Sequence, residues 1–257
     1  MKCIRMATAV LTVTLPLSGL AIQVEAQDYT APKSMFDVAF GAAVTSDYMS
    51  RGTTQTDGGP AIQGYIEADV STFYAGVWAS NVDYGFDDTE IDFSIGWRPE
   101  LGNFSFDFGY VYYYYIIDDG SSYGDLYAKT DYTVNDWLTV GGDVYYGPDY
   151  VQSSTDVLYT EGNTEIALPW DFSLSGAIGY QDFEEKYGTD YWTWNAGVSW
   201  TWRDALTFDV RYWDTDLTQK ECAGISTRRN SCDARVVASV AFDTSWNALK
   251  ELTGMGR

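Results

Sequence analysis

The sequence predicts an all-β fold: a single antiparallel up-and-down transmembrane β-barrel of about 12 strands, with short periplasmic turns and long extracellular loops. Three observations predict it. From about residue 35 to residue 242, apolar residues alternate with polar or acidic ones in segments of roughly ten residues. The joins between these segments alternate between short and long. The chain also begins with a segment typical of exported proteins.

The first 26 residues have the parts of a secretory signal peptide. Lys2 and Arg5 supply positive charge, and residues 7–22 are mostly apolar. Val24 and Ala26 are small residues of the kind found just before a cleavage site. An uncleaved membrane anchor is the alternative, but the apolar stretch is short and contains a proline and a glycine. We therefore expect residues 1–26 to be removed.

The remaining chain, about 231 residues, suffices for one domain with a sizeable core. We expect a lead-in at residues 27–35, the barrel at 36–243 and a C-terminal periplasmic tail at 244–257. The formal net charge of −22 would repel nucleic acid and excludes it as an expected partner. No segment after the signal peptide has the roughly 18 consecutive apolar residues of a membrane helix, so a membrane-spanning form must be a closed barrel.

Twelve segments are predicted to be strands from their alternation and from the turn residues between them. In residues 90–97, for example, Ile91, Phe93 and Ile95 alternate with Glu90 and Asp92. In the third segment, the rows Phe73/Ala75/Val77 and Tyr74/Gly76/Trp78 compete for the outer face, and the eighth is similarly ambiguous. The segments are 36–46, 61–71, 73–81, 89–97, 103–115, 124–134, 137–147, 156–168, 171–181, 190–202, 205–213 and 234–243.

The joins between the strands alternate in length. Every second join is tight, at residues 71–72, 98–102, 135–136, 169–170 and 203–204. The other joins are long and polar, at residues 47–60, 81–88, 116–123, 148–155, 182–189 and 214–233. Tight turns at one end and long loops at the other are typical of outer-membrane barrels, whereas a soluble sandwich does not require such regularity.

Cys222 and Cys232 lie in the longest of the predicted outer loops. An exported protein meets an oxidising compartment, so we expect a disulfide between them. The alternative is a pair of free thiols that bind a metal. That alternative lacks partner ligands, because the chain contains no histidine.

The apolar row of each predicted strand carries no charged residue, as expected of a face in contact with lipid. Aromatic residues gather near the strand ends, where the interfacial girdles of a membrane barrel lie. These residues are Trp97, Tyr112, Tyr113, Tyr114, Tyr115, Trp137, Tyr145, Tyr146, Trp170, Trp192, Trp202 and Trp213. The alternative is a soluble β-protein whose apolar face is its core; the export signal and the alternating joins favour the membrane form.

The opposite row carries most of the charge and is predicted to line the lumen. It contains ten acids and three bases: Asp37, Glu67, Asp69, Glu90, Asp92, Asp107, Asp125, Asp131, Asp143 and Asp209, against Lys129, Arg211 and Arg235. A net-negative lumen filled with water would favour cations over anions. Two alternatives remain open: these residues solvate a soluble surface, or inward acid–base pairs plug a narrow, purely structural barrel.

Catalysis is poorly supported by the sequence. Without histidine the chain cannot form a Ser-His-Asp triad, a Cys-His pair or a histidine-ligated metal site. Pairs of carboxylates arise by chance in so acidic a chain, and none has a distinguishing neighbourhood. We expect no enzymatic activity, no cofactor and no metal.

The first hairpin carries a specific pattern. Ser46-Asp47-Tyr48, Arg51-Gly52 and Gln55-Thr56-Asp57-Gly58 are followed by residues 73–83 and by Glu90-Ile91-Asp92. This pattern resembles the TorF-type porin family, exported bacterial outer-membrane proteins formerly of unknown function. The resemblance resumes at residues 212–216, at the two cysteines and at Arg235-Val236-Val237, and so covers most of the chain. It implies an outer-membrane barrel with a pore, and it implies no particular solute.

The first long loop suggests a physical role for Arg51. Near Asp47 and Asp57, Arg51 could fold this loop inward and narrow the mouth of the barrel. The alternative is that residues 57–60 form an ordinary turn and Arg51 a surface ion pair worth about 0–1 kcal/mol.

The sequence thus predicts a channel in the outer membrane of a Gram-negative bacterium. We expect passive diffusion of small solutes and cations through a narrow acidic lumen, with outer-membrane lipid, lipopolysaccharide and the outer-membrane assembly machinery as partners. One alternative is a closed structural or surface-interaction barrel. A second is a soluble exported β-barrel that binds a ligand on aromatic residues.

Overall fold

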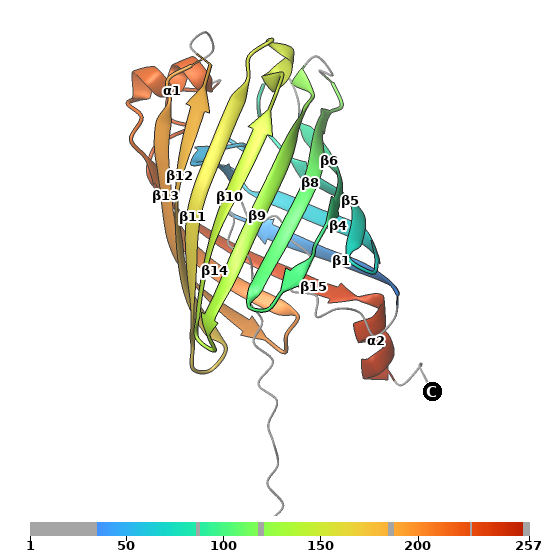
Figure 1. Cartoon of the computed structure of the whole chain (residues 1–257). Coiled ribbons are helices and arrows are strands. Elements are labelled where there is room, and N and C mark those ends of the chain that lie inside the picture. Colours follow the sequence, from blue (N-terminus) through green and yellow to red (C-terminus); the bar gives the residue numbers. More distant parts are fainter. Residues whose placement is uncertain (1–34, 86–87, 118–120, 185–187, 227, 254–257) are drawn as a thin grey trace, which may run out of the picture.

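The computed structural model describes residues 35–85, 88–117, 121–184, 188–226 and 228–253. The predicted signal peptide, residues 1–26, and most of the lead-in lie outside the described residues. Figure 1 shows a barrel of tilted strands, with the long connections at its upper end and the short turns at its lower end.

Twelve long strands in the described part of the chain build the barrel, and each lies within two residues of its predicted bounds at either end. They are β1 (Phe36–Thr45), β4 (Ala61–Val70), β5 (Phe73–Asn81), β6 (Thr89–Trp97), β8 (Phe104–Tyr115), β9 (Tyr123–Asn135), β10 (Leu138–Gly147), β11 (Val157–Leu168), β12 (Phe172–Phe183), β13 (Tyr191–Trp202), β14 (Leu206–Thr215) and β15 (Arg235–Ser245). The predicted fold class is confirmed.

The strands pair in an antiparallel order that closes on itself. Each long strand pairs with its neighbours along the chain, β1 pairs with β15, and the β6–β8 pairing completes the ring. Each of these strands therefore has a hydrogen-bonded neighbour on both sides. Such closure removes free sheet edges and satisfies the backbone polar groups within the wall.

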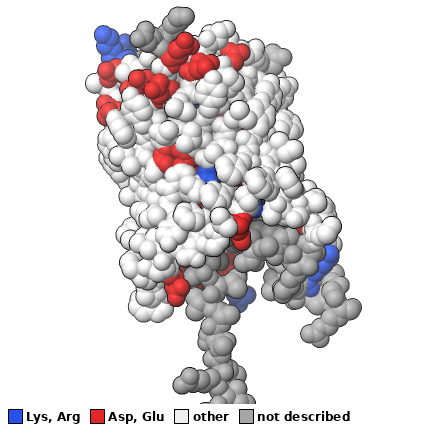
Figure 2. Space-filling model, in the orientation of Figure 1, with Lys and Arg blue, Asp and Glu red and all other residues white. Residues whose placement is uncertain are grey.

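The distribution of side chains across the wall is the reverse of that in a soluble protein. In β4, Ile62 and Ile66 are 71% and 56% exposed on the outside, whereas Gln63 and Glu67 are almost fully buried on the inside. The other long strands repeat this alternation, because successive strand residues point to opposite faces. Acidic side chains gather at the upper end of the face in Figure 2, and most of the wall below them carries no charge. An apolar belt of this extent suits contact with lipid.

The ambiguity in the third predicted strand is resolved by the structure. Phe73 and Val77 of β5 are exposed on the outside, whereas Tyr74 and Trp78 are buried inside. Exposed tryptophans near strand ends agree with the predicted girdle at Trp97, Trp137, Trp170, Trp192 and Trp202. The prediction was wrong for Tyr113, Tyr115, Tyr145 and Trp213, which are buried on the inner face because they have the same parity in their strands as the inward residues.

Short elements complete the described chain. They are β2 (Met49–Ser50), β3 (Thr53–Thr54), β7 (Glu100–Leu101), the 3₁₀ turn η2 (Tyr150–Gln152), α1 (Gln219–Ile225) and α2 (Trp246–Thr253). Thr218 caps α1 through a reciprocal capping box with Glu221. The predicted disulfide between Cys222 and Cys232 is present and joins α1 to the segment before β15. None of the helices among the described residues has the length and apolarity needed to cross a membrane.

Helix α2 begins directly after β15, at the short-turn end of the barrel (Figure 1). The sequence analysis placed a C-terminal tail here, from residue 244. The strand continues two residues further than predicted before the helix starts. The Asn247 backbone N–H donates to Asp37 Oδ1 over 3.0 Å, so that the helix is attached to the start of β1.

Candidate functional site

The first long connection, residues 46–60, folds into the interior of the barrel. Its short strands β2 and β3 form a hairpin whose two turn residues, Arg51 and Gly52, have φ angles of 46° and 82°. Positive φ at both positions is the requirement of a type I′ turn, which suits a two-residue hairpin. A side chain at Gly52 would collide with Thr193 and Thr215 on the opposite inner wall. The tip of the hairpin therefore lies directly against β13 and β14.

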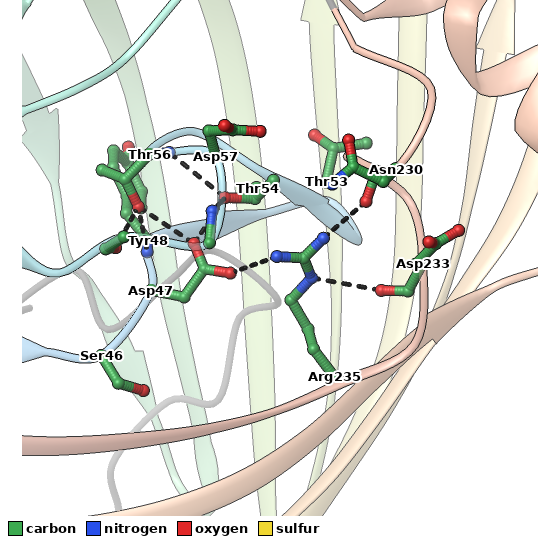
Figure 3. Close-up of polar contacts among 12 residues, drawn as sticks. Ser46, Asp47, Tyr48, Thr53, Thr54, Thr56, Asp57, Asn230, Asp233 and Arg235 are labelled. Atoms are coloured by element: carbon green, nitrogen blue, oxygen red, sulfur yellow. Dashed lines mark hydrogen bonds and ion pairs between the residues drawn. The ribbon is translucent and has the colours of Figure 1, made fainter.

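Asp47 organises the base of this hairpin (Figure 3). Its Oδ1 accepts hydrogen bonds from the hydroxyls of Thr54 and Thr56, at 2.5 and 3.0 Å. Its Oδ2 accepts from Arg235 Nη1 at 2.7 Å. Arg235 also donates to the backbone carbonyls of Asn230 and Asp233, in the last long connection. One carboxylate thus joins the hairpin to the segment that follows the disulfide.

Arg51, at the hairpin tip, reaches the wall formed by β9 to β13. Its Nη2 lies 2.6 Å from Asp125 Oδ2, and its Nη1 lies 3.4 Å from Gln181 Oε1. The Tyr191 hydroxyl donates to the Arg51 carbonyl at 2.9 Å. Burial is the largest single influence and lowers the pKa of the guanidinium, but the charge of Asp125, the nearby Tyr113 and Tyr123 and the hydrogen bond to Asp125 together raise it by more, so that the net pKa lies well above the ordinary value and Arg51 stays charged.

The Arg51 guanidinium also lies over two aromatic rings of the wall. Its Cζ is 5.1 Å from the ring centroid of Tyr145 and 5.0 Å from that of Tyr159. Both distances fall in the range of cation–π contacts, which are strongest where water is excluded. Arg51 is therefore held by one carboxylate, one amide and two rings.

At the adjoining part of the wall, formed by β6 and β8, the first long connection is held by hydroxyl groups. Tyr48 donates to Glu90 Oε1 at 2.7 Å, and Tyr115 donates to Glu90 Oε2 at 2.6 Å. The Tyr84 hydroxyl donates to Gln55 Oε1 at 2.6 Å. Burial and then the charge of Glu90 raise the pKa of Tyr48 well above its usual range, which keeps its hydroxyl protonated. The hairpin consequently spans the interior from β6 and β8 to β9–β13.

Toward the short-turn end, Arg98 occupies the interior. It follows β6 and makes a bidentate ion pair with Glu67, at 2.5 and 3.1 Å. Its Nε lies 3.3 Å from Asp107 Oδ2, and its Cζ stacks 3.6 Å from the ring centroid of Tyr74. Asp69 lies 3.8 Å away, at the edge of this cluster. The sequence analysis had assigned Arg98 only to a turn.

Two of the cavities that border the described residues lie inside the barrel. The larger, about 400 Å³, is bounded by the hairpin and by residues of the long connections. The smaller, about 80 Å³, lies between the inner wall and Arg98. Tyr113 contributes to the lining of both cavities.

All thirteen charged residues predicted to line the lumen lie on the inner face of their strands. Those nearly or fully buried are Asp37, Glu67, Asp69, Glu90, Asp92, Asp125, Lys129, Asp143, Asp209 and Arg211; Asp107, Asp131 and Arg235 are half-buried. Arg211 bonds Asn195, Ser175 and Asp209, and Lys129 lies over the rings of Tyr127 and Tyr145. Whether these residues take part in transport stays a prediction.

The sequence analysis missed several interior charges. Glu161 and Glu165 lie buried on the inner face of β11, one of the two strands that were least certain in the sequence analysis. The sequence did contain a signal for this placement. Glu161 and Glu165 are separated from each other and from Tyr159 by even numbers of residues, so all three side chains point to the same face of the strand. The expected partners of Arg51 were also wrong: Asp47 pairs with Arg235 and Asp57 with Arg228, whereas Arg51 pairs with Asp125.

The other residues of the first-loop pattern have structural roles. Ser46 exchanges hydrogen bonds with the backbone of Ala238 on β15. Gln55 bonds Thr53 and Tyr84, and Gly58, with φ of 77°, donates its N–H to Thr54 Oγ1. Among the described residues, no cluster of three or more Cys, Asp or Glu side chains is arranged to hold a metal ion.

Comparison with known proteins gives a family and a set of similar folds. Residues 29–243 match a family described as "Bacterial protein of unknown function (Gcw_chp)". No curated protein sequence matches the chain.

Among solved structures, the KdgM porin is 11% identical with a TM-score of 0.54, covering 80% of this chain and 98% of that one. The NanC porin is 12% identical, with a TM-score of 0.53 and the same coverage. The COG4313 outer membrane channel from Pseudomonas putida F1 is 9% identical, with a TM-score of 0.50, covering 85% of this chain and 98% of that one. At these identities the likeness shows a shared fold.

Proposed function

The chain belongs to the Gcw_chp family of bacterial proteins, and we propose that it is a narrow outer-membrane channel that favours small cations and uncharged solutes. This proposal accords with the resemblance of the first hairpin to TorF-type porins. It also accords with the fold shared with the KdgM and NanC porins.

The membrane part of the proposal is supported by the outer surface. Large apolar side chains, such as Ile62, Ile66 and Val236, are more than half exposed around the barrel, and lipid or the acyl part of lipopolysaccharide would cover them. The antiparallel ring leaves no unpaired strand edge to face lipid.

The channel part rests on one observation: the interior is polar and contains cavities, although the barrel is closed. Small barrels without a pore are filled by packed side chains. Here the inner face carries carboxylates, guanidinium groups and hydroxyls, with cavities of about 400 and 80 Å³ between them. Groups of this kind are compatible with water inside the barrel.

The preference for cations follows from the balance of charge inside. Arg51 and Arg98 add positive charge to the predicted inner row, and Glu161, Glu165 and Asp243 add negative charge. Acids therefore still outnumber bases on the inner face. A net-negative wall of low dielectric concentrates cations and repels anions.

The solute class proposed here differs from that suggested by one structural neighbour. A structure of the KdgM porin is described as a complex with disordered oligogalacturonate, which is a polyanion. In this chain a polyanion would meet the net-negative inner wall. We therefore propose small cations and uncharged solutes.

A closed structural barrel is the second candidate, and the inward hairpin favours it. The Arg51–Asp125 pair is held from both sides and has almost no exposed surface. If the hairpin never moves, it plugs the interior. The two candidates share one fold and differ in conductance.

Planar-bilayer recording under a potassium chloride gradient tests the proposal. We expect discrete openings whose reversal potential lies toward that of potassium. Openings that favour chloride would contradict the cation preference, and insertion without current would support the closed barrel. Insertion is verified by the different gel migration of unheated and boiled protein from the same vesicles.

A further inference from the structure

The larger cavity lies at the long-loop end, between the hairpin and the loops. Among the described residues, eight aromatic rings contribute to its wall, including Tyr84, Tyr115, Tyr123, Tyr150 and Phe183. At about 400 Å³ it falls within the range of about 300–1,000 Å³ typical of small-molecule sites. We call this cavity the tyrosine vestibule.

The rings of the tyrosine vestibule form a continuous row. Tyr113 and Tyr123 lie with ring centroids 4.8 Å apart, and Tyr123 and Tyr150 lie 4.7 Å apart. Phe183 follows at 5.9 Å from Tyr150, and Tyr191 at 6.3 Å from Phe183. These residues come from β8, β9, η2, β12 and β13, so that five elements contribute to one aromatic surface.

Packing of the rings on one another explains part of this row, since aromatic pairs contribute about 0.5–1.5 kcal/mol each beyond area burial. It does not explain why a cavity remains open beside them. Tyr84, Tyr123 and Tyr150 are only half-buried, so their rings retain surface available to a ligand.

Apart from Val151, Gly224 and Ile225, the remaining lining is polar and nearly neutral. Glu90 and Arg51 are the charged side chains that line the cavity among the described residues, and both are already paired. Ser50, Thr53 and Gln55 on the hairpin, and Gln181 on β12, add hydroxyl and amide groups. The surface therefore offers rings and neutral hydrogen-bonding groups without free charge.

From this arrangement we infer that the tyrosine vestibule binds neutral saccharides. A sugar ring has apolar C–H faces that pack on aromatic rings, and its hydroxyls need neutral donors and acceptors around its edge. An organic cation would suit aromatic rings as well, but the carboxylate that lines the cavity, Glu90, already accepts hydrogen bonds from Tyr48 and Tyr115 and so offers a cation no free negative charge.

The inference rests on the proposed function in one respect. The long-loop end of the barrel is taken as the outer entrance of the channel, and the saccharide is placed at that entrance, above the hairpin. Gln181 lines the tyrosine vestibule and also contacts Arg51 at 3.4 Å. A sugar bound here therefore sits directly over the Arg51–Asp125 pair and is expected to reduce ion current.

Calorimetric titration of the full-length protein in detergent, with maltotriose and cellotriose as probes, tests the inference. We expect saturable binding of at least one of them, weakened roughly tenfold or more in Tyr150→Ala and retained within about threefold in Tyr150→Phe, because the ring supplies the contact. Tyr132→Ala, on the outer face of β9, is the matched control and should bind like the unaltered protein. Tyr123→Ala is a second test variant, and the gel-shift assay shows which variants are folded.

The outcomes separate this inference from the channel proposal. If neither neutral sugar binds while the protein conducts potassium, the saccharide site is wrong and the channel stands. If a sugar binds in the expected variant order but no current is found, the site stands and the channel is wrong. Trigalacturonate and tetraethylammonium are titrated in parallel, and if only one of these charged ligands binds, the site does not take neutral saccharides. Equal binding of a neutral sugar by Tyr150→Ala, Tyr123→Ala and the unaltered protein would show that the sugar does not bind in the tyrosine vestibule.

Discussion

Arg51 and Asp125 are 74 residues apart in sequence, yet they form an ion pair of 2.6 Å inside the barrel. Their side chains are 10% and 0% exposed. The pair joins the tip of an inward hairpin to β9, near the long-loop end of the barrel wall. If the proposed channel function holds, it is the contact on which the open or closed state of the channel is expected to depend.

Replacement of Arg51 by alanine should loosen the hairpin tip and raise the single-channel conductance. The variant leaves the Asp125 carboxylate without its cation, and the loss of one partner from a buried pair typically costs about 3–5 kcal/mol. Water that enters the interior would solvate the Asp125 carboxylate and relieve this cost. The entry of water is the opening of the path that we expect. Conductance in planar bilayers measures it, and Arg203→Ala, at the opposite end of the barrel, serves as the control. An unchanged conductance would rule out a role of Arg51 in narrowing the path.

Replacement of Arg98 by glutamine should strengthen the preference for potassium over chloride. Arg98 neutralises part of the charge of Glu67, Asp69 and Asp107, so its loss makes this end of the interior more negative. The reversal potential under a salt gradient should shift further toward that of potassium. Arg203→Gln removes the same charge from another short turn, where the side chain stacks on Trp202 outside the barrel. An equal shift of the reversal potential in Arg98→Gln and Arg203→Gln would show that the effect does not depend on the position of Arg98 inside the barrel.

Removal of the disulfide, as Cys222→Ser with Cys232→Ser, should loosen the hairpin without unfolding the barrel. The closed loop has a sequence separation of 10 residues, for which chain entropy predicts a local loss of roughly 3 kcal/mol. This segment holds the hairpin, because the Thr54 N–H donates to the Ser231 carbonyl at 2.9 Å. We expect faster proteolysis within residues 216–234 and noisier current. The gel shift on heating should be unchanged, and its loss would mean that the disulfide supports the barrel itself.

Substitution of Gly52 by alanine should prevent the hairpin tip from docking. A Cβ at this position collides with Thr193 and Thr215, and the φ of 82° disfavours any residue with a side chain. The substitution is expected to destabilise the docked hairpin by more than about 1 kcal/mol and to leave the stability of the barrel wall unchanged. Higher conductance and faster proteolysis in residues 46–60 would be the result. Gly85→Ala is the control, because its positive φ of 81° lies in an open loop where an added Cβ meets no atom.

The wall of the barrel could be predicted because its rule is local. A strand places successive side chains on opposite faces, so parity alone separates Glu67 from Ile66 and Asp92 from Phe93. The same rule, applied strictly, would have placed Tyr113, Tyr115, Tyr145 and Trp213 inside. Their assignment to the girdle was wrong because aromatic residues near a strand end suit both an interface and an aromatic interior.

The interior contacts could not be predicted in the same way. Arg98 lies in a short turn, and nothing local shows that its side chain reaches back to Glu67, 31 residues earlier. Arg51 has two acids in its own loop, and proximity in sequence suggested them as partners. In the folded barrel those acids are taken by Arg235 and Arg228, which arrive from the other end of the chain.

The sequence by itself determined the number of strands, their order, the face that most of the charged residues of the wall occupy and the bond between Cys222 and Cys232. Each of these follows from alternation, from turn residues or from the oxidising compartment of an exported protein. Only the tertiary structure decided between the two alternatives for the first long loop, by placing residues 46–60 inside the barrel, and only it showed that Arg51 meets Asp125. The reason is that closure of the ring brings distant strands within reach of one loop, and which wall group that loop contacts depends on distances across the interior that no local pattern contains.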